Sequence, residues 1–237
     1  GFFFFFFFEG LSGKPWYNLC SGSDRVLSAF YEAFVCFFNS ANEVAGAVMI
    51  IGGECFMHCY TRPAKSENGS TNCPHCQGKA ASEEVANLVN IVKRAVKTSG
   101  THKALYAWPY SAFIWSAQDP HQLTWIDNLD PDVSVLSNFD CGDTDLTNGA
   151  GVKFFDYNIK CIGPSETFAM QAKRLASKQR PIFAKVESST TPDAFFVPYL
   201  PLYYRWTARW SSLLNSGVKG FVGQWRFFGM NGSSPEE

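Results

Sequence analysis

The sequence predicts an α/β fold, a (β/α)8 TIM-type barrel of which about six strands are visible. Short apolar runs alternate with longer segments of helical periodicity, which is typical of parallel strands joined by helices. Polar and aromatic residues collect directly after the apolar runs, as they do at the carboxyl-end face of a barrel. Neither G-x-G-x-x-G nor a Walker A sequence is present, which argues against a nucleotide-binding sheet. We therefore expect residues 1–237 to be one barrel domain, a fragment that lacks the first strands.

Six runs have the length and composition of buried strands. Each is too short for a free-standing helix and lacks regular alternation, as expected for parallel strands covered on both faces. The first run consists of seven consecutive phenylalanines, Phe2–Phe8, and the strands missing from a closed barrel are expected before residue 1. The remaining strands are expected over 46–52, 103–108, 133–136, 181–186 and 219–225.

Four segments between these runs have helical periodicity. The second opens with Ser82-Glu-Glu, a capping signature, and stops before Gly100. The third begins at Ser165, with Glu166 following, and the fourth ends at Gly217. The helices are expected over 24–41, 82–98, 165–179 and 203–216.

The charge distribution excludes some classes of partner. Twenty basic and 21 acidic residues give a net charge of -1 and form no long run of one sign, so we expect no nucleic-acid partner. The phenylalanine run is shorter than the roughly 20 apolar residues that cross a bilayer, and it lacks the features of a signal peptide. We expect no membrane insertion. The 23 phenylalanines favour self-association or assembly through exposed aromatic side chains.

Carboxylates hold equivalent positions after different apolar runs. Glu54 follows the run at 46–52, and Glu187 follows the run at 181–186. Asp140, in "SNFDCGD", holds a similar position between them. A closed barrel would bring such side chains to one pocket, where one carboxyl group protonates the leaving oxygen of a glycoside and another attacks or activates a nucleophile. The predicted catalytic residues are therefore Glu54, Glu187 and Asp140.

Structural roles are the alternative for each of these carboxylates. Glu54 could orient the loop that follows it, Glu187 could bond the backbone of a neighbouring strand, and Asp140 could cap a loop or bind a sugar hydroxyl. Other polar and aromatic residues at the strand ends are predicted to bind substrate, since flat aromatic rings stack on the apolar faces of sugars. They are His58, Tyr60, Trp108, Tyr110, Asn138 and Trp225.

Several phrases resemble a known group of enzymes. "GGECFMHCYTRP", "CPHC", "YAWPYSAFIW" and "ESSTTPDAFFVPYLPLYYRW" are similar to glycosidase-like barrels related to β-N-acetylhexosaminidases, over about residues 40 to 230. The resemblance implies Glu54 as general acid/base and Glu187 as nucleophile or second carboxylate. It implies a glycoside hydrolase that cleaves β-linked sugars, N-acetylhexosaminides among them, without a cofactor. Retaining, inverting and substrate-assisted routes stay open.

Cysteines gather in a loop excursion over 55–80. Cys73-Pro-His-Cys76 is a CxxC, and Cys55 and Cys59 precede it, with His58 and His75 as further ligand types. Two interpretations are open: disulfides that pin the loop, which we favour and which involve no metal, or a structural zinc site. A zinc-dependent hydrolase is a weaker interpretation, because CxxC spacing is typical of closed structural sites.

Two glycosylation sequons point to the compartment. Asn68-Gly-Ser and Asn231-Gly-Ser lie in Gly/Ser-rich contexts, and the eight cysteines are an even number. They favour a secreted, extracellular or lumenal glycoprotein. The expected partner, carbohydrate, follows from the glycosidase interpretation. The alternative to an enzyme is a catalytically inactive, carbohydrate-binding or structural glycoprotein of an extracellular assembly.

Overall fold

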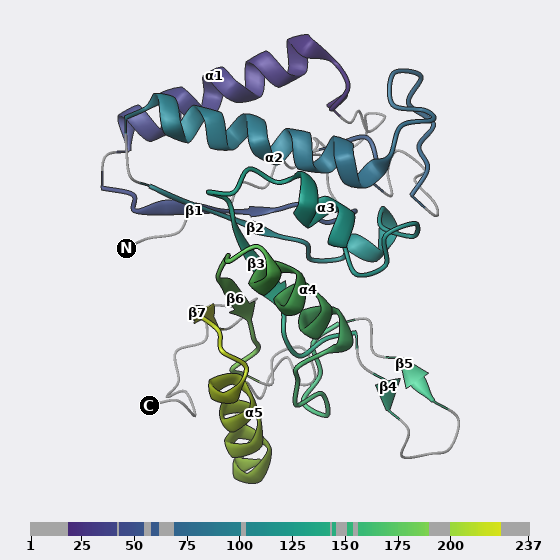
Figure 1. Cartoon of the computed structure of the whole chain (residues 1–237), viewed down its shortest axis with the longest axis vertical. Coiled ribbons are helices and arrows are strands. Elements are labelled where there is room, and N and C mark those ends of the chain that lie inside the picture. Colours follow the sequence, from purple (N-terminus) through teal and green to yellow (C-terminus); the bar gives the residue numbers. More distant parts are fainter. Residues whose placement is uncertain are drawn as a thin grey trace. The chain divides into compact units, whose positions relative to one another are not determined.

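The computed structural model describes residues 19–41, 43–54, 58–61, 69–100, 103–142, 144–145, 151–153, 156–189 and 200–223 (Figure 1). Strands and helices alternate along much of this part of the chain. The helices are α1 (Asp24–Ser40), α2 (Ala81–Thr98), η2 (Ala112–Ile114), α3 (Leu123–Asn128), α4 (Glu166–Ser177) and α5 (Tyr203–Asn215). The strands are β1 (Gly46–Ile50), β2 (Ala104–Trp108), β3 (Ser134–Asn138), β4 (Thr144–Asp145), β5 (Val152–Lys153), β6 (Ile182–Lys185) and β7 (Gly220–Val222).

Five of these strands form one sheet in the order β1-β2-β3-β6-β7. β1 pairs with β2 in parallel from Gly46↔Ala104 to Ile50↔Trp108, and β6 pairs with β7 in parallel. β4 and β5 form a separate antiparallel pair. Because the paired strands run parallel, residues that follow neighbouring strands leave the sheet at the same edge.

The predicted eight-stranded barrel is wrong. Within the described residues the sheet has five strands, and its order begins at β1 and ends at β7. Alternation of strands and helices predicts parallel pairing correctly, but it does not encode closure, which depends on strand number and stagger. The expected strand at Phe2–Phe8 lies outside the described residues.

The other predicted elements are confirmed to within a few residues. α2 buries the predicted apolar face, including Val85, Leu88 and Val92, which are fully buried. Ser165 caps α4, because its hydroxyl accepts a hydrogen bond from Phe168 N. Ser82 does not cap α2, which begins at Ala81; its hydroxyl donates to Asp119 Oδ2 at 2.9 Å instead.

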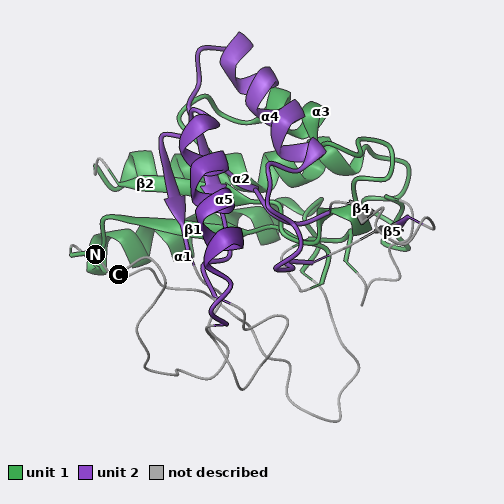
Figure 2. Cartoon of the chain, turned by 90° about the horizontal axis from the view of Figure 1, so that it is seen from below, with its two compact units in different colours: residues 1–135 green, residues 136–237 purple. Residues whose placement is uncertain are grey.

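The chain divides into two compact units, residues 1–135 and 136–237 (Figure 2). In the first unit α1 lies along α2, and α2 contacts β2 (Figure 1). The second unit contains β6 and β7, and α4 contacts β6 there. No helix in the described part of the chain is long and apolar enough to cross a membrane.

Candidate functional site

Two predicted carboxylates lie next to each other in the second unit. Asp140 comes two residues after the end of β3, and Glu187 comes two residues after the end of β6. β3 and β6 are neighbours in the sheet, so both residues leave it at the same edge. Asp140 is fully buried, and Glu187 is 2% exposed. A charged side chain this deeply buried needs partners, because its water shell is lost.

Four side chains hold Glu187 from different sides, and we call them the Glu187 clamp: Asp140, Lys185, Ser189 and Arg209. The Asp140 carboxylate accepts a hydrogen bond from Glu187 N, at 3.1 Å for Oδ2 and 3.3 Å for Oδ1. Arg209 donates to Glu187 O at 2.7 Å. Lys185 Nζ lies 3.4 Å from Glu187 Oε2, and Ser189 Oγ donates to Oε1 at 2.8 Å. The backbone and both carboxylate oxygens of Glu187 are therefore fixed.

The charges of this cluster are balanced in pairs. Lys185 forms an ion pair with Glu187, and Arg209 Nη1 forms one with Asp140 Oδ2 at 3.2 Å. Burial raises the pKa of Asp140 to about 6, although the Arg209 and Lys185 charges act in the opposite direction. Arg209 also donates to Cys161 O at 2.6 Å, which ties α5 to the loop before α4.

Glu54 lies in the first unit, four residues after the end of β1, and its side chain is exposed. Gly52 and Gly53 precede it in tight surroundings. A Cβ atom at residue 52 would lie 1.9 Å from Tyr110 O, and one at residue 53 would lie 2.3 Å from Ile114 Cβ. These glycines let the chain pass close to the 110–114 segment before it reaches Glu54.

The predicted sugar-binding residues fall in different surroundings. His58 is fully buried, its Nδ1 accepts from Tyr60 N at 3.1 Å, and burial lowers its pKa to about 4. Trp108 is buried in the core, while Tyr110 is half-buried with its ring 5.2 Å from the Trp108 ring. Asn138 accepts a hydrogen bond from the Tyr157 hydroxyl at 2.7 Å. Trp225 and the sequons at Asn68 and Asn231 lie outside the described residues.

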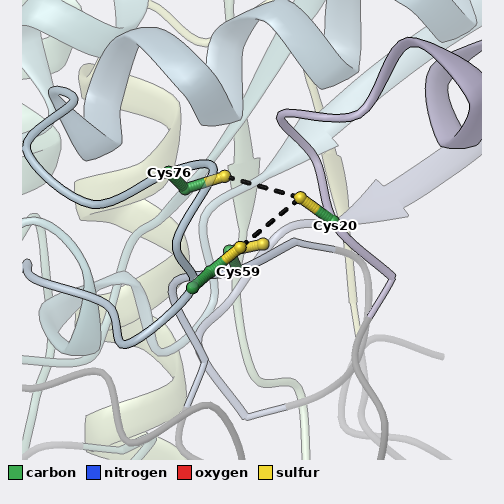
Figure 3. Close-up of side chains that lie close together, drawn as sticks. Cys20, Cys59 and Cys76 are labelled. Atoms are coloured by element: carbon green, nitrogen blue, oxygen red, sulfur yellow. Dashed lines mark hydrogen bonds between the residues drawn. The ribbon is translucent and has the colours of Figure 1, made fainter.

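A second cluster, in the first unit, consists of four cysteines: Cys20, Cys59, Cys73 and Cys76. Their sulfur atoms all lie within 4.8 Å of one another. Cys20 Sγ is 3.4 Å from Cys73 Sγ and 3.9 Å from Cys76 Sγ. Figure 3 shows the side chains of Cys20, Cys59 and Cys76 pointing toward one another from separate stretches of the chain. Cys55, the other predicted member, lies outside the described residues.

Hydrogen bonds hold the backbone around the four-cysteine cluster. Thr71 Oγ1 donates to Cys59 O at 2.6 Å and accepts from Cys73 N at 3.2 Å. Ser21 Oγ accepts from Cys59 N at 3.3 Å. The predicted sugar contact Tyr60 is fully buried here, and its hydroxyl donates to Cys76 O at 3.0 Å. Burial raises the pKa of the Cys76 thiol to about 11.

Four residues of these clusters were not predicted from the sequence: Cys20, Lys185, Ser189 and Arg209. Cys20 stands alone, far from the CxxC in sequence, so no local spacing marks it. Lys185 interrupts an apolar strand two residues before Glu187, and this pattern was a usable signal. Arg209 shares the buried face of α5 with Trp206 and Leu213. Their helical spacing predicts that the Arg209 side chain is buried with them.

Comparisons with protein-family models, curated proteins and solved structures found no match to this chain.

Proposed function

We propose that this protein is a glycoside hydrolase that acts on β-linked sugars and uses Glu187 as its nucleophilic carboxylate. The observation that supports this most is the Glu187 clamp. It holds one carboxylate at the carboxyl end of a parallel strand, where α/β enzymes bind their substrates. A carboxylate with both oxygens and its backbone already bonded loses little conformational freedom when it reacts, which is the usual arrangement for a group that stabilises a transition state.

In the proposed reaction a Glu187 oxygen attacks the anomeric carbon of the sugar. The glycosidic C–O bond breaks, and the departing oxygen takes a proton from a carboxylic acid. A water molecule then gives a proton to the carboxylate that protonated the leaving group, attacks the same carbon, releases the sugar and restores the Glu187 carboxylate. The Lys185 ammonium, 3.4 Å from Glu187 Oε2, compensates the negative charge before attack and after release.

Asp140 has a positioning role in this proposal. Its carboxylate accepts a hydrogen bond from Glu187 N and pairs with the Arg209 guanidinium. It fixes the backbone from which the Glu187 side chain extends. Glu54, the proton donor that the sequence predicts, belongs to the first unit, and the proposal rests on Glu187 alone.

The test is turnover of 4-nitrophenyl β-glycosides, N-acetyl-β-glucosaminide among them, by the wild-type chain and by Glu187→Gln. The variant keeps the shape of the side chain and removes its nucleophilic charge, so kcat should fall by about a hundredfold or more. The control is Glu166→Gln, which changes an exposed glutamate in the first turn of α4 outside the clamp. The control should keep wild-type turnover. Equal activity of Glu187→Gln and the wild type would refute the role of Glu187.

A second measurement tests the nucleophilic role directly. Glu187→Ala leaves space for a small anion, so added azide should restore turnover and yield a glycosyl azide. Binding of sugars without any turnover in the wild type would instead support the inactive carbohydrate-binding alternative.

A further inference from the structure

We propose that Cys20, Cys59, Cys73 and Cys76 bind one zinc ion as a closed structural centre. Four sulfurs about 2.3 Å from a zinc ion at tetrahedral angles lie about 3.8 Å apart. The two distances from Cys20 Sγ, 3.4 Å to Cys73 and 3.9 Å to Cys76, fall on either side of this value. All four sulfurs lie within 4.8 Å of one another, so a single ion can reach every one of them.

The arrangement fits one metal better than two disulfides. Two disulfides would sort the four sulfurs into two close pairs, whereas Cys20 lies at nearly the same distance from two partners. The cysteines are unpaired in the structure. The turn at Cys73-Pro-His-Cys76 also has the CxxC spacing of structural zinc sites, and its backbone is folded back by a hydrogen bond from Cys76 N to Cys73 O at 3.1 Å.

The donor set decides which metal and which kind of site. Four thiolates are soft ligands, which favour zinc over magnesium or calcium. In an iron–sulfur cluster the cysteines are divided among two or more irons, and those on different irons stand farther apart than ligands of one ion. Because the four protein ligands complete a tetrahedron, no position is left for water or substrate. Cys59 and Cys76 are also almost fully buried, at 2% and 0% exposed, so the site is structural and not catalytic.

The surroundings match those of a metal centre. Thr71 and Ser21 bond the backbone of the ligand residues, as outer groups that orient ligands do. A Cβ atom at Gly22 would lie 2.8 Å from Cys76 Sγ and 3.4 Å from Lys79 Nζ, so a glycine there lets the Cys20 segment approach the cluster. Lys79 Nζ forms an ion pair with Glu84 Oε1 at 3.1 Å beside this segment.

Zinc would join three stretches of the first unit that the sequence separates. Cys20 precedes α1, Cys59 follows β1, and the CxxC precedes α2. Binding releases the thiol protons and converts the free energy of metal binding into stability of this fold. The inference does not depend on glycosidase activity.

The test is the metal content of the full chain, expressed with added zinc and purified without chelators. Elemental analysis should find about one zinc per chain in the wild type. Cys20→Ser and Cys73→Ser should lose it, whereas Cys36→Ser, which changes an exposed cysteine of α1 outside the cluster, should retain it. Cobalt exchanged into the wild type should give the absorption bands of a tetrahedral thiolate site, a readout that needs no variant.

Three results would overturn the zinc site. One is a metal-free wild type whose mass and peptide map show disulfides among these four cysteines. Another is iron in place of zinc, with the absorption of an iron–sulfur cluster. The third is full zinc content in soluble Cys20→Ser and Cys73→Ser.

Discussion

Arg209→Met tests the Glu187 clamp by removing one partner of a buried ion pair. Arg209 is 1% exposed, pairs with Asp140 at 3.2 Å, and donates to the carbonyl oxygens of Glu187, Asn158 and Cys161. Methionine fills much of the same space but leaves the Asp140 charge and these carbonyls without their donor. Breaking a buried ion pair in this way costs about 3–5 kcal/mol of unfolding free energy. We expect a loss in that range at pH 8.

The matched control is Arg205→Met, one turn earlier on α5. Arg205 donates to the carbonyl oxygens of Ile159 and Lys160 at 3.4 and 3.2 Å, in a more exposed position. Its replacement should cost less than about 1 kcal/mol. Urea denaturation, followed by tryptophan fluorescence and by circular dichroism, measures the unfolding free energy of both variants. Coincident transitions in the two signals show that unfolding is two-state.

The pH dependence sharpens this test. The pKa of Asp140 is raised from 3.8 to about 6, so the stability from its protonated form is fully present below about pH 4 and is lost as pH rises through about 6. Without Arg209 the pKa of Asp140 rises further, because that guanidinium favours the charged carboxylate. The cost of Arg209→Met should therefore be smaller at pH 5 than at pH 8. Equal losses of unfolding free energy for the two arginine variants, or a loss for Arg209→Met that is independent of pH, would show that the Arg209–Asp140 ion pair does not stabilise the fold.

Two further predictions concern local structure. Gly52→Ala should lower the unfolding free energy measured in urea by about 3 kcal/mol or more, because its Cβ would lie 1.9 Å from a backbone oxygen. Gly100→Ala, at φ +67 with open space around it, should lower it by about 1 kcal/mol. Similar losses for the two variants would contradict the close packing at Gly52. Ser165→Ala should lower the unfolding free energy by about 1 kcal/mol, because it deletes the cap of α4. Thermal unfolding measures this loss, with Ser177→Ala at the other end of the helix as the control. An unchanged melting temperature for Ser165→Ala would show that the cap does not stabilise the fold.

Local patterns in the sequence predict the elements well, because each depends on neighbouring residues. The apolar spacing of Val85, Leu88 and Val92 places α2 correctly, and the short apolar runs become parallel strands. The prediction of a closed barrel was wrong because closure depends on strand number and stagger, and the periodicity of the sequence does not encode them.

The candidate sites were predictable only in part. Asp140 and Glu187 stand out after their strands, but the bond from Glu187 N to Asp140 depends on the pairing order of the sheet. The CxxC spacing of Cys73 and Cys76 identifies them from the sequence as possible metal ligands or disulfide partners. Cys20 joins them only through the fold, since 53 residues separate it from Cys73.

The nucleophilic role of Glu187 can be tested by trapping the proposed glycosyl-enzyme on this residue. A 2-deoxy-2-fluoro β-glycoside with a good leaving group slows both steps and allows the covalent ester to accumulate. Mass spectrometry of the digested protein should find the sugar on the peptide that contains Glu187, and none on that peptide from Glu187→Gln. Turnover of substrate with the label on another residue, or with no label at all, would contradict the account.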